Sequence, residues 1–235
     1  MHPGPHWRPY HVNQVFLQRL GAGIFAVASL ACVESAQSKI ITPAAAPAQG
    51  GPAGAAPQQH VNEAPVNQAD VDFMSGMIAH HAQAVIMAGW AKSHGARKDV
   101  AVLCERIVVG QRDEIELMQT WLRDRGRPVP DGKSTRMRMK MNGVEHDMLM
   151  PGMLSDEEMA ALDKARGAEF DRLFLTGMIK HHQGAIHMVD ELFASFGAGQ
   201  DETIFRFASD VYADQSTEID RMEKMLAVPG DSRIP

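Results

Sequence analysis

Residues 73–87 of the chain read FMSGMIAHHAQAVIM, and residues 174–188 read FLTGMIKHHQGAIHM. A shift of 101 positions aligns a phenylalanine, a glycine, two methionines and an adjacent pair of histidines in these segments. A second match follows each segment, because residues 111–122 (QRDEIELMQTWL) are similar to residues 215–226 (QSTEIDRMEKML). The chain therefore contains an internal duplication, in which each copy joins a histidine-bearing segment to a glutamate-bearing one.

The spacing of apolar residues in both copies predicts α-helices. At about 100° per residue, Phe73, Met77, His80 and His81 fall within an arc of about 100° on one helix face. No alternation of the kind that predicts strands stands out after residue 66, so we expect none there. The sequence thus predicts an all-α, four-helix bundle-like domain built from two duplicated helix pairs.

The domain divides at proline, glycine and capping residues. Gly126 and the prolines after it end the first pair, and Ser155 with Glu158 forms a capping box that starts a short helix. The predicted parts are 67–130 for the first helix pair, 131–155 for a methionine-rich connector, and 156–230 for the second helix pair.

The first 66 residues have a different composition. In residues 1–36, two arginines precede the apolar run Leu20–Cys32, which is too short to span a bilayer of about 30 Å but is typical of a signal peptide. Residues 37–66 are rich in Ala, Pro, Gly and Gln and predict a disordered linker. We expect a periplasmic or otherwise extracytoplasmic protein without an integral membrane span in its mature form. Whether Cys32 becomes a lipid anchor is left open.

The composition excludes several classes of function. The 235 residues carry a net charge of −6, and no basic stretch is interleaved with aromatic residues, so a nucleic-acid partner is not expected. There is no CxxC, phosphate-binding glycine loop or nucleophile motif. The 16 methionines and 11 histidines stand out instead, because both side chains bind soft or borderline metal ions.

The sequence resembles a known bacterial family over about residues 67–227. The blocks D-x-x-F-x-x-G-M-I-x-H-H-x-x-A and Q-x-x-E-I-x-x-M-x-x-W-L, together with the segment from Met150 to Ile186, are similar to the domain of unknown function 305. The resemblance implies an exported, ferritin-like helical domain and, in members of the CopM type, periplasmic copper binding for copper tolerance. The second copy departs from the pattern at Met225, which stands where the first copy has Trp121.

The paired histidines and methionines favour copper. Met77 and His81 lie one turn apart on one face, so a single helix can offer a thioether and an imidazole together. Thioether sulfur selects Cu(I), and imidazole accepts either oxidation state, so copper is the expected ion with Cu(I) favoured. Adjacent His80 and His81 diverge by about 100°, so they are not expected to bind one ion together. The candidate metal ligands in the helices are His80, His81, His181, His182, Met77, Met178, Met87 and Met188.

The connector adds a second set of candidates. Six of the 16 methionines fall within residues 137–153, and M-x-M spacing in an extended segment places sulfurs on one side. The added candidates are Met137, Met139, Met141 and His146. The interleaved cations Arg138 and Lys140 count against this site, and the alternative is a loop that covers the bundle with methionine.

The histidines also have a structural explanation. Glu114 and Glu218 lie on apolar helix faces, where a buried carboxylate needs a partner such as histidine. The same methionines could simply fill the core. A histidine and glutamate network in a bundle that acts through a protein partner is therefore the alternative to a copper carrier or buffer. A di-metal carboxylate oxidase is a weaker alternative, because the chain has no Glu-x-x-His.

Five further residues carry individual expectations. Asp70 and Asp171 are expected to cap their helices or face the helix dipoles, and His94 to be a cation at a helix C-terminus. His187 is expected to be exposed and Cys104 to be a small buried residue. The metal stoichiometry, the oxidation state of the bound ion and the oligomeric state are left open by the sequence.

Overall fold

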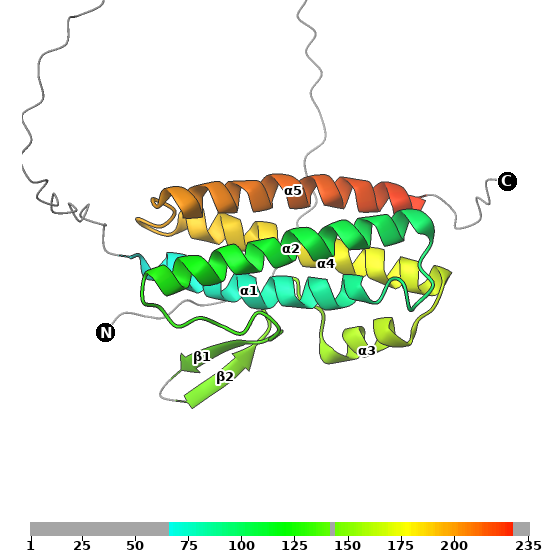
Figure 1. Ribbon diagram of the computed structural model, residues 1–235, viewed down its shortest axis with the longest axis horizontal. Helices are drawn as coiled ribbons and strands as arrows, with labels where there is room; N and C mark the ends of the chain where they lie inside the picture. The colour runs from blue at the N-terminus through cyan, green and yellow to red at the C-terminus, as the bar shows by residue number, and fades with distance from the viewer. Residues whose placement is uncertain (1–65, 142–143, 228–235) are drawn as a thin grey trace, which may run out of the picture. The chain divides into compact units, whose positions relative to one another are not determined.

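The computed structural model describes residues 66–141 and 144–227, and it places four long helices side by side (Figure 1). These are α1 (Gln68–Gly89), α2 (Lys98–Asp124), α4 (Ala168–Ala194) and α5 (Glu202–Ala227). Helix α1 packs along α2, α4 packs along α5, and α1 contacts α4 to join the two pairs. The prediction of a helical, four-helix bundle-like domain is confirmed. The predicted signal peptide, Cys32 and the linker up to residue 65 lie outside the described residues.

The helix ends agree with the capping signals in the sequence. The Asn67 side chain accepts a hydrogen bond from the Ala69 N–H at the start of α1. The short helix α3 (Asp156–Lys164) begins with the predicted capping box, in which Ser155 and Glu158 each bond the other's backbone. After α2, the chain turns through Gly126, whose φ of 61° favours glycine. Local sequence thus sets where these helices begin and end.

The connector contains a β-hairpin, so the expectation that no strand follows residue 66 was wrong. Strands β1 (Met137–Met141) and β2 (Val144–Met148) pair antiparallel, with Met137 opposite Met148 and Met139 opposite His146. The M-R-M-K-M run does alternate, but it contains none of the β-branched or aromatic residues that favour strands and is therefore a weak strand signal. The hairpin extends away from the bundle (Figure 1), and its base packs against the core through Met137 and Met148.

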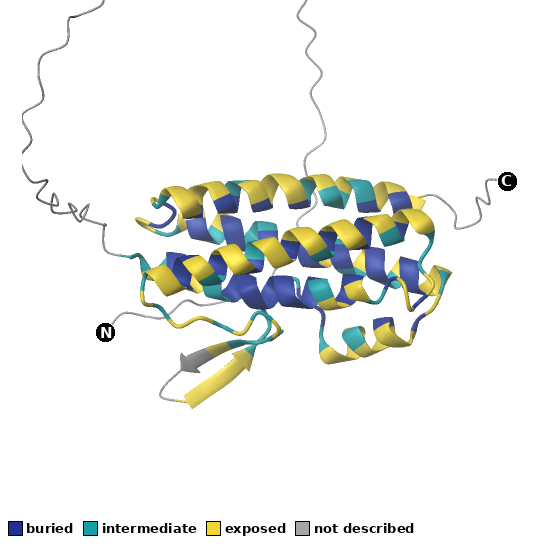
Figure 2. Cartoon of the chain, viewed as in Figure 1, coloured by how far each residue is buried: buried dark blue, intermediate teal, exposed yellow. Residues whose placement is uncertain are grey.

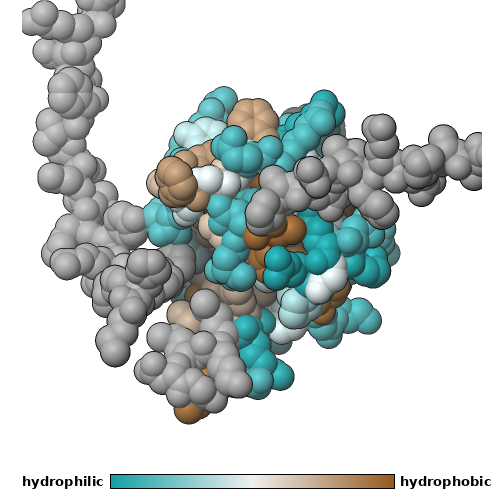
Figure 3. Space-filling view, turned by 90° about the vertical axis from the view of Figure 1, so that its left-hand side faces the viewer, coloured by the Kyte–Doolittle hydropathy of each residue, from teal (hydrophilic) through white to brown (hydrophobic). Residues whose placement is uncertain are grey.

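Burial differs sharply between the inner and outer helices. Figure 2 shows α1 buried over most of its length, whereas α2 and α5 show a buried stripe and an exposed face. Helix α1 is covered by α2, by α4 and by parts of the connector. At the end of the bundle viewed in Figure 3, apolar groups are scattered among hydrophilic ones, and Phe193, Phe196 and Phe205 near the α4–α5 turn are exposed. Within the described ranges, no helix is long and apolar enough to cross a membrane.

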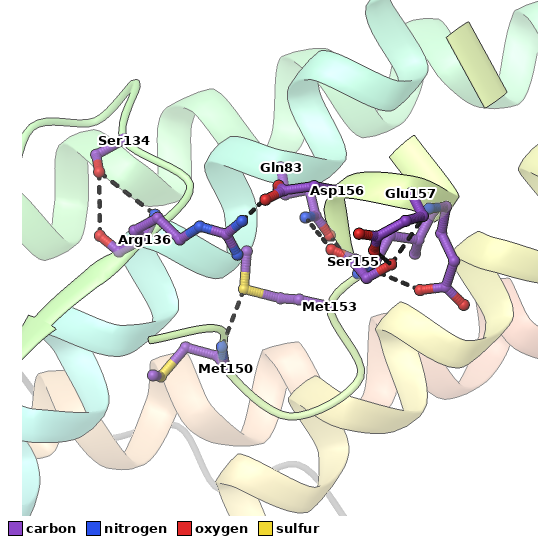
Figure 4. A network of polar contacts seen from close by, with 10 residues as sticks. Gln83, Ser134, Arg136, Met150, Met153, Ser155, Asp156 and Glu157 are labelled. Atoms are coloured by element: carbon purple, nitrogen blue, oxygen red, sulfur yellow. Dashed lines mark hydrogen bonds and ion pairs between the residues drawn. The ribbon is translucent and has the colours of Figure 1, made fainter. Parts of the chain in front are cut away.

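Residues 150–154, which we call the strap, cross the contact between α1 and α4. On the α1 side, the Gln83 side chain donates to the Leu154 carbonyl at 2.9 Å and accepts from the Leu154 N–H at 2.8 Å. On the α4 side, a Cβ on Gly184 would stand 2.0 Å from the Pro151 carbonyl oxygen. Within the strap, the Met150 N–H donates to the Met153 sulfur at 3.2 Å (Figure 4). The strap is therefore held by a side chain on one helix and by backbone contact with the other.

Asp70 and Asp171 lie in the first turns of α1 and α4, where a carboxylate faces the helix dipole as expected, but they link the two helix pairs and do not cap their own helices. The Asp70 carboxylate accepts the Gly199 N–H in the α4–α5 turn at 2.7 Å. The Asp171 carboxylate accepts the Arg97 N–H just before α2 at 3.2 Å. Burial raises the pKa of both carboxyls. Each pair thus uses an acid at the start of its first helix to hold the turn of the other pair.

The close approach at Gly184 gives a stability prediction with a matched control. Gly184→Ala should lower the free energy of unfolding by about 1 to 3 kcal/mol, because the new methyl group collides with the strap backbone. Gly110→Ala, inside α2 with no neighbouring atom within 4 Å, should raise it by about 0.5 to 1 kcal/mol. Urea denaturation followed by circular dichroism measures both. Equal effects of the two substitutions would show that the strap does not rest on α4.

Candidate metal centre

The two histidine pairs meet at the contact between α1 and α4. All four side chains are fully buried, at 0% exposure. The rings of His80 and His181 lie against each other with centroids 3.7 Å apart. The centroids of His81 and His182 lie 6.3 and 6.2 Å from those of the histidines that precede them. The duplication therefore brings the four imidazoles, two from each copy, into one part of the core.

Glutamates from the outer helices hold two of these histidines. His81 Nε2 donates to the Glu114 carboxylate of α2 at 2.7 Å. His182 Nε2 donates to the Glu218 carboxylate of α5 at 2.6 Å. Both glutamates are about one quarter exposed, so each carboxylate reaches from the surface into the core. The prediction that Glu114 and Glu218 have histidine partners is confirmed.

The other two histidines differ in their partners. His80 Nε2 donates to the Pro151 carbonyl oxygen of the strap at 3.1 Å. Neither ring nitrogen of His181 has a hydrogen-bond partner among the described residues. Among the described residues, the strap therefore hydrogen-bonds the histidine of α1 and not that of α4.

Every one of the four imidazoles has a buried Nδ1 without a hydrogen-bond partner in the described part of the chain. Carbonyl and carboxylate oxygens only accept, so the proton lies on Nε2 of His80, His81 and His182. In the neutral ring, the Nδ1 lone pair is then unshared. His181 also keeps an unshared lone pair, whichever nitrogen carries its proton. Each imidazole, in its neutral form, therefore has one ring nitrogen whose lone pair no described residue uses.

Burial keeps His80 and His181 neutral. Desolvation lowers the pKa of His80 well below its ordinary value of 6.5, and the neighbouring His81 and His182 lower it further. Desolvation likewise lowers the pKa of His181, and His80 is the next largest cause. A neutral imidazole is the form that binds metal ions. His80 and His181 are therefore in the metal-binding form at neutral pH.

Thioethers lie next to the histidines on the same helix faces. Met77 and Met178 are fully buried, each one turn before His81 or His182. Among the described side chains, no group of three or more His, Cys, Asp and Glu residues is arranged to hold a metal ion. A centre here would therefore combine a few imidazoles with thioethers, which suits a soft ion and not one that needs many oxygen ligands.

The remaining candidate ligands lie elsewhere. Met87 and Met188 each reach across to the other copy, with Met87 Cε 3.5 Å from the position of a Cβ on Gly177 and Met188 Cε 3.3 Å from that on Gly76. The structure does not bring His146 to the core, because it lies exposed on β2. Met137 contacts the bundle near Gly76, and the side chains of Met139 and Met141 lie outside the described part of the structure.

Three other expectations can be compared with the structure. Cys104 is buried, as expected, and burial raises the pKa of its thiol to about 12. His94 lies close to the C-terminal end of α1, as expected, but it is buried there, and its ring contacts the Asp163 carbonyl of α3 at 2.8 Å. His187 is partly exposed, not fully exposed as expected, and lies 3.2 Å from the Glu191 carboxylate.

Sequence reasoning missed the strap as part of the centre. Pro151 contributes a backbone carbonyl, which leaves no side-chain signature, and Gln83 is a polar residue whose partner, the Leu154 backbone, leaves none either. The signal in the sequence was the MPGM run at 150–153, where a proline and a glycine interrupt the methionine-rich connector. Only the fold shows that this run crosses the histidines.

The buried neutral histidines predict that the metal-free protein loses stability in mild acid. Because the pKa of His80 and of His181 is lower in the folded chain than in the unfolded chain, the unfolded chain takes up more protons below pH 6.5. The free energy of unfolding should fall between pH 7.5 and pH 5.5, as measured by urea denaturation. The fall should be smaller in His181→Leu, which removes one of the two groups. An unchanged free energy of unfolding over this pH range would contradict the conclusion that His80 and His181 are neutral in the folded protein.

Comparisons with known proteins agree with this architecture. The chain matches the family described as Domain of unknown function (DUF305) over residues 70–226. A solved DUF305 protein from Streptomyces coelicolor is 28% identical with a TM-score of 0.57, covering 68% of this chain and 92% of its own. A DUF305 fragment from Deinococcus radiodurans is 27% identical with a TM-score of 0.56, covering 69% and 98%. A comparison with curated proteins found no match.

A further solved structure is CopM in its Cu(I)-bound form. It is 27% identical to this chain with a TM-score of 0.51, covering 66% of this chain and 94% of its own. CopM has also been solved in a Cu(II)-bound form, with 28% identity and the same TM-score. Since the family match spans most of the sequence and the solved neighbours share its fold, this chain belongs to the DUF305 family.

Proposed function

We propose that this protein is an exported copper carrier or buffer, which holds Cu(I) in the histidine core of its bundle and contributes to copper tolerance. The observation that carries the proposal is the set of four buried imidazoles whose Nδ1 atoms have no partner among the described residues. The candidate ligands are His80, His81, His181 and His182, with Met77 and Met178 as thioether donors. An ion would bind at most two of these imidazoles together with thioether sulfur, because no three of the described His, Cys, Asp and Glu side chains are arranged around one ion.

The hydrogen bonds of these histidines support the proposal. Histidines that bind metals usually donate the second ring N–H to a carboxylate or a backbone carbonyl, which fixes the ring and its tautomer. His81 and His182 donate to glutamates, and His80 donates to the Pro151 carbonyl. Three of the four rings therefore already have the arrangement expected of a ligand, with the lone pair that would meet the ion left free.

The electrostatics of the core favour a monovalent ion. The four rings are fully buried, and burying an ionic charge is costly in proportion to how strongly water solvated it. A soft singly charged ion with nitrogen and sulfur ligands loses less on burial than a doubly charged one. Glu114 and Glu218, one ring away from the core, supply the compensating negative charge.

Known structures support the copper assignment and the location. CopM, which shares the fold at 27% identity, was solved with Cu(I) and with Cu(II). The Streptomyces coelicolor neighbour is designated a secreted protein, which agrees with the signal-like residues 1–36 of this chain. A lipid anchor at Cys32 and a homo-oligomer stay open, and the hairpin ligands Met139, Met141 and His146 stay predictions.

A second candidate function follows from the same hydrogen bonds. The pairs His81–Glu114 and His182–Glu218 satisfy buried polar groups, as a purely structural network would. In that case the bundle would act through a protein partner without a metal ion. His181 bears most directly on the choice, because it makes no hydrogen bond to a described residue and its ring contacts that of His80.

His181→Leu is the sharpest test of the copper core. The substitution removes no hydrogen bond, since neither His181 nitrogen has one to a described residue, and leucine fills a similar volume. We expect the fold and thermal unfolding to be retained while Cu(I) affinity falls, as measured by competition with a chromogenic Cu(I) chelator. His187→Gln, on the same helix but partly exposed, is the matched control and should bind copper normally. Full copper binding by His181→Leu, or none by the wild-type protein, would contradict the proposal.

Glu114→Gln tests the role of the carboxylates. If Glu114 orients His81 for the ion, the substitution should weaken Cu(I) binding by roughly 10- to 100-fold. In a purely structural network, only the free energy of unfolding of the metal-free protein would change. Glu116→Gln, on the exposed face of α2, is the control and should change neither quantity. Chelator competition and urea denaturation of all three proteins distinguish the outcomes.

A further inference from the structure

Three methionines from three separate segments converge on Gly76 of α1. A Cβ on Gly76 would stand 2.9 Å from the Met150 sulfur, 3.4 Å from the Met137 sulfur and 3.3 Å from the Met188 methyl carbon. Met137 comes from β1, Met150 from the strap and Met188 from α4. The two sulfurs therefore flank the same point on the surface of α1, and the third thioether can turn toward it by rotation about its terminal bonds.

The other copy of the repeat shows that packing alone does not require these sulfurs. Gly177 holds the corresponding place in α4, one turn before His181. Its nearest neighbours are two methyl carbons of Leu154 at 3.1 and 3.5 Å and the Met87 methyl carbon at 3.5 Å. Carbon atoms thus cover the glycine of the second copy, whereas sulfur atoms cover that of the first.

A surface groove leads to the methionine group. The groove has a volume of 950 Å³ and lies between the start of α1, the loop after α2 and the hairpin, with Ser75 and Met137 in its wall. Met137 lines the groove and is partly exposed, whereas Met150 and Met188 do not line it and are buried, at 8% and 6% exposure. An ion in the groove would therefore meet Met137 first.

The charges in this groove do not repel a cation. Three arginines and four carboxylates are in its lining. The positive charge of Arg138 was expected to weaken cation binding here. Its side chain lies 3.4 Å from Asp147 and 3.8 Å from Glu145. Arg136 pairs with Asp156. Arg138 is thus paired within the hairpin and Arg136 with α3, and the charged residues that line the groove sum to a slightly negative charge.

We propose that Met137, Met150 and Met188 form a thioether-only site for a soft monovalent cation, Cu(I) or Ag(I). Thioethers select such ions over harder divalent ones, because their sulfur donors are soft and uncharged. Gly76 lies one turn before His80 on the same face of α1, so the site lies between the groove and the histidine core. An ion would move from one site to the other by ligand exchange alone, with no change of oxidation state. The thioether site is separate from the histidine core, and it stands whether or not the core binds copper.

The test uses the full chain labelled with ¹³C on the methionine methyl groups and titrated with Ag(I), a monovalent probe that is stable in air. Single Met→Leu variants assign the methyl signals. We expect the signals of Met137, Met150 and Met188 to shift together as one equivalent of silver binds. The Met87 signal should stay in place at that equivalent, since Met87 lies over the glycine of the second copy. Shifts of Met87 as large as those of Met150, or no shift at the three proposed ligands, would overturn the site.

A variant pair tests the same site by stoichiometry. The double variant Met137→Leu with Met150→Leu conserves volume and should fold while losing one bound silver equivalent per chain. Met87→Leu is the matched control and should lose none. Retention of all silver by the double variant would overturn the thioether site, while loss of Cu(I) affinity by His181→Leu would still support the histidine core. Loss of one silver equivalent by the double variant, with full Cu(I) affinity in His181→Leu, would support the thioether site and contradict copper binding by the histidine core. If the double variant does not fold, the methyl shifts of the wild-type chain decide.

Gly76→Ala adds a check that leaves all methionines in place. Its new methyl group would stand 2.9 Å from the Met150 sulfur and so displace it. Silver affinity at the methionine signals should fall in this variant and not in Gly177→Ala, which meets only carbon atoms. An equal effect of the two substitutions would contradict a site that depends on the space over Gly76.

Discussion

The contact between His80 and His181 is the constraint on which the rest of this structure depends. Two imidazole rings lie 3.7 Å apart between centroids, fully out of water, where the two helix pairs meet. Protonation of either ring would cost free energy, because neither solvent nor a carboxylate contacts these two rings. The pair must therefore stay neutral, and each ring keeps a lone pair that it can give to another partner. The Glu114 and Glu218 carboxylates, one ring farther out, hold the flanking histidines in matching geometry.

The strap closes this core by using the two copies of the repeat differently. Gln83 and Gly184 occupy equivalent places in the two histidine-bearing helices, 101 positions apart. Gln83 reaches out to bond the Leu154 backbone, whereas Gly184 has no side chain and lets the Pro151 backbone rest on the helix. The two copies of the repeat therefore differ where the strap crosses them, because the single connector meets a side chain on α1 and bare backbone on α4. The same asymmetry places sulfur over Gly76 and carbon over Gly177.

These features give the two groups of soft donors different surroundings. The imidazoles are enclosed and held by hydrogen bonds, so an ion among them would be retained and shielded from water. The thioethers near Gly76 adjoin a groove, and methionine side chains are flexible and uncharged, so an ion among them would exchange readily. A protein that takes up and releases a soft ion needs both kinds of surroundings. Membership of the DUF305 family fixes the bundle, while the arrangement of donors within it carries the proposed chemistry.

The sequence by itself determined the helices, their caps and the partnership of histidine with glutamate. Helix periodicity and capping depend on residues within a few positions of one another, and a carboxylate on an apolar face needs a partner whatever the fold. Only the tertiary structure decided that the ring of His80 packs against that of His181 and that the strap crosses them. It also decided that Asp70 and Asp171 connect the two helix pairs and that the connector forms a hairpin. These contacts join residues far apart in the chain, several of them through backbone atoms, and no local pattern of side chains encodes where such atoms meet.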